Sequence, residues 1–292
     1  MPEPVTITAH TSHALAALFS LDGKTLLSAG MDGLVKLWSV PGFEDAGTFE
    51  GHAKSVNTLS LSPDGGTLAT GSTDRTVKLW SFPGGEVLRT LTGHKDTVAA
   101  VAISPDGKLV ASASYDSKVR LWSAGEGEAL ATLSGHPKNV GSVAFTRDGR
   151  TLASAGVGNL ILLWSVPSGE RLGELSGHEV AAGSLTLSPD GGLLASAGYE
   201  GTVRLWSTAD WSEARSIPLG GKGQFPLAFS PDGATLAVGM EKKVALHSVA
   251  TGDLREELAV SAKGVYSVAF SPDGRFLASA SADKRVRVWR TA

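Results

Sequence analysis

Histidine, hydroxyl and aspartate side chains recur at fixed spacing along this chain, and these three groups together form a nucleophilic triad in many hydrolases. In such a site the imidazole acts as base, the hydroxyl attacks, and the carboxylate orients the imidazole. Three complete sets are present, each ending on a tryptophan: His10, Ser28, Asp32 and Trp38; His52, Thr70, Asp74 and Trp80; His94, Ser112, Asp116 and Trp122. One enzyme needs one such site, so the threefold repetition favours a structural role.

The repetition extends over the whole sequence. Asp-Gly pairs start at positions 22, 64, 106, 148, 190, 232 and 273, so the steps are 42 residues five times and then 41. Tryptophan stands at 38, 80, 122, 164, 206 and 289, and His247 occupies the equivalent place in the sixth repeat. A fixed period of this length is the sequence signature of an array or propeller. Seven repeats account for residues 1–292, which we expect to form a single domain.

Within one repeat, the signals are those of strands and turns. In the third repeat, TVAAVAI is followed by the turn SPDG, KLVASASY and KVRLWS are separated by a turn at DS, and ALATLSGH ends the repeat. These are four short β-rich runs with turn residues between them, and no run has a helical period. A lone four-stranded sheet cannot bury both faces, whereas seven stacked sheets can.

These features resemble the WD40 repeat family. The resemblance rests on four Gly-His pairs, at Gly51-His52, Gly93-His94, Gly135-His136 and Gly177-His178, and on the tryptophan that closes each repeat. The aspartate that usually follows this tryptophan is replaced by serine, as in Ser39 and Ser81. The resemblance implies an all-β fold, a seven-bladed β-propeller of four-stranded antiparallel blades. It also implies that PVTITA at the N-terminus pairs with RVRVWR in the last blade and closes the propeller.

The resemblance also assigns the three polar sets a role as buried hydrogen-bond chains, from indole to hydroxyl to imidazole to carboxylate. Later repeats depart from the pattern. Gly158 and Glu200 stand at the aspartate position of repeats four and five, Ser261 replaces the histidine of repeat seven, and repeat six has Gly220, Val238 and His247 at the histidine, hydroxyl and tryptophan positions. We therefore expect blade six to be the least restrained.

Composition excludes several classes of function. The net charge of −3 and the pI near 6.2 argue against nucleic acid or an anionic membrane as partner. The chain has no cysteine, and its N-terminus does not resemble a signal peptide. We find no metal-ligand spacing, phosphate loop or dinucleotide fingerprint, so we expect no cofactor and no catalytic residue. These features predict a cytoplasmic, monomeric protein.

In the resembled family, partners usually bind the face that carries the loops from outer to inner strand and the turns between the second and third strands. Three positions in each blade tend to make that contact. Bulky side chains occupy those positions here: His13, Leu15, Met31, Tyr115, Tyr199, Phe225, Met240 and Tyr266. Exposed aromatic residues are favoured interface anchors, so we interpret this set as the partner-binding surface. Most of it falls in repeats five, six, seven and one.

Charge is also unevenly distributed among the loops. Five lysines lie in the loops through which the chain enters the blades: Lys54, Lys95, Lys138, Lys222 and Lys263. The turns before each fourth strand are acidic, with residues such as Glu126, Glu128 and Asp210. A basic rim around aromatic residues predicts an acidic or phosphorylated peptide as partner.

The sequence thus predicts a non-catalytic scaffold that binds a protein or peptide. Three alternatives remain open: a designed or consensus-like scaffold without a physiological partner, an enzyme that uses the axial channel, and a piece of a larger signalling protein. The initial methionine and the use of every residue for blades favour a complete chain over the third alternative.

Overall fold

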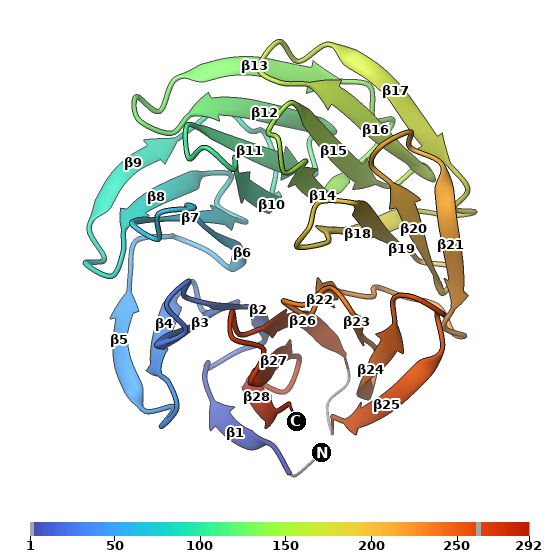
Figure 1. The fold of residues 1–292 in the computed structure, drawn as a ribbon. Helices are drawn as coiled ribbons and strands as arrows, with labels where there is room; N and C mark the ends of the chain where they lie inside the picture. Colours follow the sequence, from blue (N-terminus) through green and yellow to red (C-terminus); the bar gives the residue numbers. More distant parts are fainter. Residues whose placement is uncertain (1–2, 261–263, 292) are drawn as a thin grey trace. The chain divides into compact units, whose positions relative to one another are not determined.

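The computed structural model describes residues 3–260 and 264–291. In these residues the regular elements are all β-strands, and they form seven four-stranded antiparallel sheets (Figure 1). The predicted all-β fold of seven four-stranded antiparallel blades is therefore confirmed. The chain divides into two compact units, Asn57–Gly223 and Met1–Val56 with Gln224–Ala292. Whether residues 1–292 form one domain stays a prediction.

The unit Asn57–Gly223 holds blades 2 to 5, and each blade is made of four consecutive strands in chain order. Their bounds are β6 (Val56–Leu61), β7 (Thr67–Ser72), β8 (Val77–Ser81) and β9 (Val87–Leu91); β10 (Val98–Ile103), β11 (Leu109–Ser114), β12 (Lys118–Ser123) and β13 (Ala129–Ser134); β14 (Val140–Phe145), β15 (Thr151–Gly156), β16 (Leu160–Ser165) and β17 (Arg171–Ser176); β18 (Ala182–Leu187), β19 (Leu193–Gly198), β20 (Thr202–Ser207) and β21 (Glu213–Pro218).

The other unit holds blades 1, 6 and 7. Blade 1 is β2 (Ala14–Phe19), β3 (Thr25–Gly30), β4 (Val35–Ser39) and β5 (Asp45–Phe49); blade 6 is β22 (Leu227–Phe229), β23 (Thr235–Gly239), β24 (Lys243–Ser248) and β25 (Leu254–Ala259); blade 7 is β26 (Val265–Phe270), β27 (Phe276–Ser281) and β28 (Arg285–Arg290), completed by β1 (Val5–Thr8).

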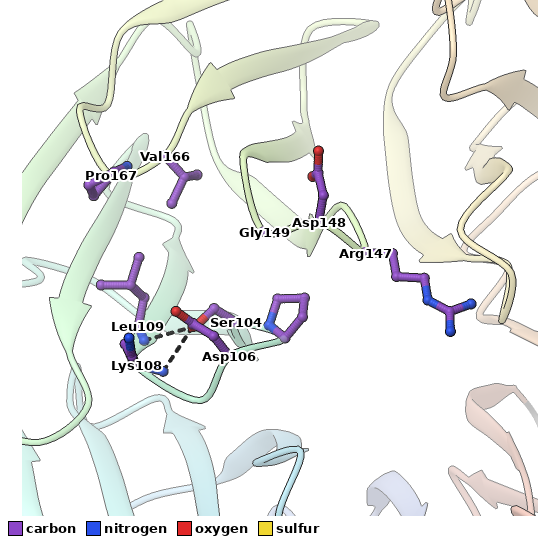
Figure 2. A pocket seen from close by; sticks show the side chains of 10 residues that line it. Ser104, Asp106, Lys108, Leu109, Arg147, Asp148, Gly149, Val166 and Pro167 are labelled. Atoms are coloured by element: carbon purple, nitrogen blue, oxygen red, sulfur yellow. Dashed lines mark hydrogen bonds between the residues drawn. The ribbon is translucent and has the colours of Figure 1, made fainter.

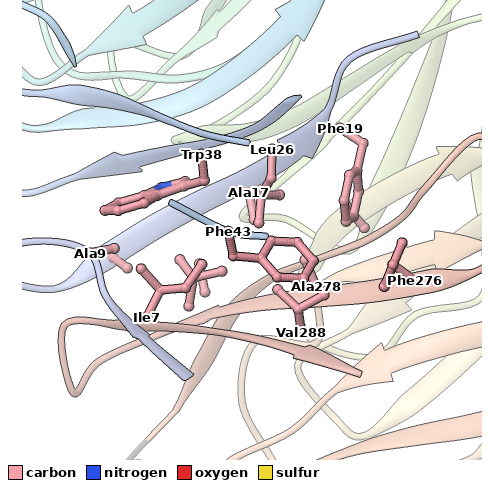
Figure 3. Close-up of a cluster of buried hydrophobic side chains, with 14 residues drawn as sticks. Ile7, Ala9, Ala17, Phe19, Leu26, Trp38, Phe43, Phe276, Ala278 and Val288 are labelled. Atoms are coloured by element: carbon pink, nitrogen blue, oxygen red, sulfur yellow. The ribbon is translucent and has the colours of Figure 1, made fainter. Parts of the chain in front are cut away.

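The N-terminal strand closes blade 7, as predicted. Strand β1 pairs antiparallel with β28, with Val5 opposite Val288 and Ile7 opposite Val286. Ile7 is only 8% exposed and belongs to a core cluster that includes residues of blades 1 and 7 (Figure 3). In that cluster Phe43 packs edge-on against Phe276, with ring centroids 5.5 Å apart.

The second strand of each blade is almost fully buried, since it lies between two other strands of its own sheet. Strand β7, TLATGS, shows why small residues are needed there. A Cβ on Gly71 would lie 2.7 Å from Val98 Cγ1 in blade 3 and 2.8 Å from Thr58 Cγ2. Glycine at this position lets blades 2 and 3 approach closely.

The Asp-Gly pairs form the tight turns that the sequence predicts. In blade 2, Ser62 Oγ donates to Asp64 Oδ1 at 2.5 Å, and Asp64 also accepts the N–H of Gly66 at 2.9 Å. Gly65 has a φ of 72°, which glycine adopts readily. The same serine and backbone bonds hold the pKa of Asp64 below its usual value. Asp273, in the equivalent turn of blade 7, has its pKa lowered to about 2 by the Ser271 hydroxyl and the Arg275 N–H.

Hydroxyl groups also link first strands of neighbouring blades. Thr58 and Ser60 of β6 accept the N–H groups of Val101 and Ile103 of β10, at 3.4 and 3.1 Å. Ser142 of β14 accepts the N–H of Leu185 at 3.0 Å in the same way. These bonds satisfy N–H groups on the free edges of the first strands. The sequence analysis did not predict them.

Blade 6 has the shortest first strand, three residues in β22. Its second turn is tight, with the N–H of Met240 bonded to the carbonyl of Lys243 at 2.8 Å. Gly239 pairs with Val244, whereas in blade 5 Ala197 pairs with Val203, so the blade 6 turn is one residue shorter.

In the described part of the chain, no helix is long and apolar enough to cross a membrane.

Candidate functional site

Blades 1 and 3 contain the complete polar chain. In blade 1, Trp38 Nε1 donates to Ser28 Oγ at 2.9 Å, and Ser28 Oγ lies 2.9 Å from His10 Nε2. His10 Nδ1 lies 2.9 Å from Asp32 Oδ1. The carboxylate also accepts the backbone N–H of Thr11 at 2.9 Å. This chain of hydrogen bonds therefore connects the second strand, the third strand, the turn between them and the loop that enters the blade.

Blade 3 repeats this geometry closely. Trp122 Nε1 donates to Ser112 Oγ at 2.8 Å, and Ser112 Oγ lies 2.8 Å from His94 Nε2. His94 Nδ1 lies 2.9 Å from Asp116 Oδ2, which accepts the N–H of Lys95 at 2.8 Å.

The direction of these bonds fixes the histidine tautomer. An indole can only donate, so the serine oxygen accepts from tryptophan and turns its own hydrogen toward His Nε2. His Nε2 is then the acceptor, and Nδ1–H donates to the carboxylate. Burial lowers the pKa of His94, although Asp116 opposes this effect. Burial alone would raise the pKa of Asp116, but the Lys95 N–H and His94 outweigh it and lower the pKa.

The hydroxyls of these sets are inaccessible to a substrate. Ser28, Thr70 and Ser112 are each 0% exposed. A nucleophile must meet its substrate within about 3 Å, and these oxygens lie inside the blades. The arrangement is thus a structural hydrogen-bond network rather than a catalytic triad.

Blade 2 shows the same tryptophan contact, with Trp80 Nε1 bonded to Thr70 Oγ1 at 2.9 Å. Its carboxylate, Asp74, accepts the N–H and the hydroxyl of Thr76 at 3.0 and 2.6 Å. His52 is half-buried, unlike His10 and His94, which are buried.

Blade 5 is more complete than its sequence suggests. Glu200 stands at the aspartate position, and its Oε1 lies 2.5 Å from His178 Nδ1. His178 Nε2 and Trp206 Nε1 both contact Ser196 Oγ at 2.8 Å. A Cβ on Gly198 would lie 2.1 Å from Glu200 Oε1, so glycine makes room for the longer side chain. The fifth repeat departs from the sequence pattern at this position, but the glutamate takes the place of the aspartate in the network.

Blades 4 and 7 vary the network in two ways. In blade 4, His136 Nε2 lies 2.6 Å from Ser154 Oγ, and Gly158 supplies no carboxylate. In blade 7, Arg287 is 3% exposed and donates to Asp283 Oδ2 at 2.5 Å and to Ser281 Oγ at 3.0 Å. A guanidinium thus bonds the aspartate there, which the sequence analysis missed.

In blade 6, the buried His247 fills the tryptophan position and donates from Nδ1 to the carbonyl of Gly252 at 3.1 Å. Val238 is fully buried where the other blades have a hydroxyl. The blade therefore replaces polar bonds with apolar contact at this point.

The predicted partner-binding residues differ in their exposure. Met31 is 45% exposed, Tyr115 39% and Tyr266 36%. His13, Leu15, Tyr199 and Met240 are half-buried. Phe225 is 5% exposed, so the expectation that it is an exposed contact residue is wrong. Its ring belongs to the apolar core.

Two of the predicted contact residues, Tyr115 and Tyr199, lie in the unit Asn57–Gly223, in the turns between second and third strands of blades 3 and 5. Burial raises the pKa of the Tyr115 phenol, and the neighbouring Tyr199 and Asp96 raise it further. The Tyr199 ring lies over Gly183 of β18, because a Cβ there would be 2.6 Å from Tyr199 Cε2. Gly183 therefore leaves room for the ring. The sequence analysis placed Tyr115 apart from the main cluster, whereas the structure places it in the same compact unit as Tyr199.

The other unit contains an aromatic contact between two of the predicted partner-binding residues. His13 stacks on Tyr266 with ring centroids 5.8 Å apart and an interplanar angle of 24°. His13 lies in the loop that enters blade 1, and Tyr266 lies on β26 of blade 7. This contact therefore joins two blades of that unit.

The predicted lysine rim is solvent-exposed where the structure describes it. Lys54, Lys95, Lys138 and Lys222 are all exposed. Lys263 lies outside the described residues, as does Ser261.

A hollow of about 510 Å³ lies at the opposite end of blades 3 and 4 (Figure 2). It is formed by the turns between the first and second strands of both blades, with Val166 and Pro167 from the turn before β17. The Asp106 carboxylate on its rim accepts from the Ser104 hydroxyl and the Lys108 N–H, at 2.6 and 3.0 Å. That carboxylate is engaged in its own turn. Residues 3–260 and 264–291 contain no cluster of histidine, aspartate and glutamate able to hold a metal ion.

Seven four-stranded antiparallel blades, with a tryptophan–hydroxyl–histidine–carboxylate network repeated in blades 1, 3 and 5, define a β-propeller protein. The chain belongs to the WD40 family, because the family model described as "WD domain, G-beta repeat" matches residues 3–39, 43–81, 85–123, 127–165, 169–207 and 254–290. The unmatched stretch 208–253 contains Gly220, Val238 and His247, the substitutions of the sixth repeat. A comparison with curated proteins found no match.

Proposed function

We propose that this protein is a non-catalytic scaffold that binds a protein or peptide at the blade ends carrying the entry loops and the turns between second and third strands. WD40 propellers generally act as protein-interaction scaffolds. The buried hydroxyls of the polar networks argue against an enzyme built on them.

One observation carries the proposal: Tyr115 and Tyr199 occupy equivalent turns of blades 3 and 5 within one compact unit. Both rings lie in turns between second and third strands, and Tyr115 is 39% exposed. Val157, from the equivalent turn of blade 4, is 41% exposed. Aromatic side chains next to exposed apolar surface are common anchors for a bound peptide.

The surrounding charge favours an acidic or phosphorylated segment as the partner. Lys95 and Lys138 lie in the loops that enter blades 3 and 4, in the same unit as the two tyrosines, and both are exposed. An ammonium group attracts carboxylate or phosphate and contributes most to the association rate.

The test is affinity purification from cells with the parent and the double variant Tyr115→Ala/Tyr199→Ala. We expect the double variant to lose the partner while it stays folded, because Tyr115 is exposed, Tyr199 is half-buried and neither side chain belongs to the core. Recovery of the same partner by both proteins would overturn the proposal.

A matched control removes apolar surface elsewhere on the same unit. Leu88 and Leu172 are 42% and 56% exposed and lie on β9 and β17, away from these turns. Leu88→Ala/Leu172→Ala should keep the partner. A scaffold without a physiological partner would give no specific protein with any of these chains.

A further inference from the structure

The last strand of each sheet has one edge free of backbone pairing, and most of these strands carry groups that discourage another strand from adding there. Charged side chains, proline and short length are the usual protections. The protected strands are β5 with Asp45, β9 with Arg89, β17 with Arg171 and Glu174, β21 with Glu213, Arg215 and Pro218, and β25 with Arg255, Glu256 and Glu257. Strand β1 is uncharged, but it has only four residues and follows Pro4.

No residue within strand β13 provides any of these protections. Its sequence is ALATLS, six residues without charge, proline or glycine. Ala129, Leu130, Thr132 and Ser134 are exposed, and Leu130 is 48% exposed. Leu133 is buried and fixes the strand against blade 4. The backbone is thus held in place with its outer edge open to another strand.

We propose that β13 binds a second copy of this chain, with the two β13 strands pairing antiparallel about a two-fold axis. A two-fold axis perpendicular to the sheet keeps the exposed face of each copy on the same side. Thr132 then lies opposite Thr132 of the other copy, and Leu130 lies opposite Ser134. Paired threonines directly across two strands are a favourable combination.

The charges at the two ends of β13 support this partner. Glu126 and Glu128 precede the strand, and Lys138 follows it; all three are exposed. Antiparallel pairing brings the acidic end of one copy beside the basic end of the other. The attraction occurs twice because the axis is two-fold. Parallel addition would instead place like ends together.

The contact is small, so the association should be weak. A six-residue strand edge covers less surface than a standard stable interface. We therefore expect a monomer–dimer equilibrium that shifts with protein concentration, in contrast to the monomer that the sequence analysis predicts. Salt should weaken it, since the end charges are exposed.

The test is sedimentation equilibrium of the full chain over a wide concentration range, for the parent and for Thr132→Lys. Two lysines opposite each other at the axis should raise the dimer dissociation constant about fivefold or more. A mixture of Thr132→Lys and Thr132→Glu should restore association, because opposite charges then meet. This rescue distinguishes contact at the axis from a change in folding.

Thr90→Lys is the matched control. Thr90 is the equivalent exposed residue of β9, a strand already protected by Arg89. We expect this variant to dimerise like the parent. A parent that remains monomeric at every concentration, or a Thr132→Lys chain that dimerises as the parent does, would overturn the proposal and leave the edge available to a segment of another protein.

Discussion

The buried histidines of blades 3 and 4 differ in one partner, and this difference sets their electrostatics. His94 donates to Asp116, whereas His136 has no carboxylate at the same position because Gly158 stands there. Burial lowers the pKa of both, but Asp116 opposes the effect for His94. For His136, burial and Arg171 lower the pKa from 6.5 to about 4. Protonation of His136 therefore lowers the stability of the folded chain more than protonation of His94 does.

The variant His136→Asn should make stability less dependent on pH. The folded chain holds fewer protons on this group than the unfolded chain between pH 6.5 and about 4. Its contribution is therefore complete above pH 6.5 and decreases as the pH falls, reaching a loss of about 2 kcal/mol at pH 5. Denaturant unfolding at pH 7.5 and pH 5 measures this. The parent should lose about 2 kcal/mol more than the variant, and equal losses would contradict the assignment.

Blade 4 has lost the carboxylate together with the backbone donor that would bind it. In blades 1 and 3 the aspartate accepts the N–H of Thr11 or Lys95. Blade 4 has Pro137 there, which has no N–H. A Cβ on Gly158 would lie 2.7 Å from Pro137 Cγ, so the proline ring occupies part of the space of the missing side chain.

These two positions should therefore be energetically coupled. Gly158→Asp alone is expected to destabilise the chain by about 1–3 kcal/mol, through the clash and the positive φ of 130°. Combined with Pro137→Lys, the clash disappears and a donor returns, so the cost should fall by about 1 kcal/mol or more. A double-mutant cycle from chemical denaturation measures the coupling. Additive effects would mean that the two substitutions are independent.

The resemblance to the WD40 family predicted the polar networks of blades 1 and 3, and the residue types at the repeat spacing identified their members. It could not predict that Glu200 would replace an aspartate, since this depends on the space that Gly198 leaves in three dimensions. It also failed for Phe225, because a position common to exposed contacts in the resembled family is occupied here by a core side chain. Exposure depends on the packing of neighbouring loops, which spacing does not report.

At the scale of elements, the strand that closes blade 7 comes from the opposite end of the chain. The resemblance to the WD40 family predicted this pairing, because it implies that the first strand of the first repeat completes the last blade. Strand β1 contributes the buried Ile7, and the following Ala9 is 0% exposed. The strand also covers the outer edge of β28, which would otherwise be unpaired.

Deletion of residues 1–9 should destabilise the protein strongly. Loss of the Ile7 side chain from the core alone costs about 2–5 kcal/mol, and the pairing to β28 is lost as well. For a chain of this size, 3 kcal/mol corresponds to roughly 6–12 °C in melting temperature. Ile7→Ala should show part of this effect, and Val5→Ala little, because Val5 is 49% exposed. Calorimetry would contradict the closure role if the truncated chain melted within about two degrees of the parent.

At the scale of the whole molecule, blades 2, 3, 4 and 6 place their charges unevenly between their two ends. The strands are antiparallel, so the entry loop and the turn between second and third strands lie at one end of a blade. Exposed lysines occur at this end, as in Lys95 and Lys138. The turn before the last strand lies at the other end and is acidic, as in Glu126 and Glu128. A net charge of only −3 hides this separation.

The separation predicts that partner association slows as salt rises. The Debye length, over which charges are screened, decreases from about 30 Å at 0.01 M to about 8 Å at 0.15 M ionic strength. If the lysine end attracts an acidic or phosphorylated peptide, the association rate constant should fall about tenfold or more over this range, with a smaller change in dissociation. Stopped-flow or surface-based kinetics would measure both rates.

Lys95→Glu/Lys138→Glu should reduce the association rate constant and its salt dependence together. Lys108→Glu, an exposed lysine at the opposite end of blade 3, should leave both near the parent's values. A rate that does not change with salt, or a partner segment rich in lysine and arginine, would show that these lysines only solvate the loops.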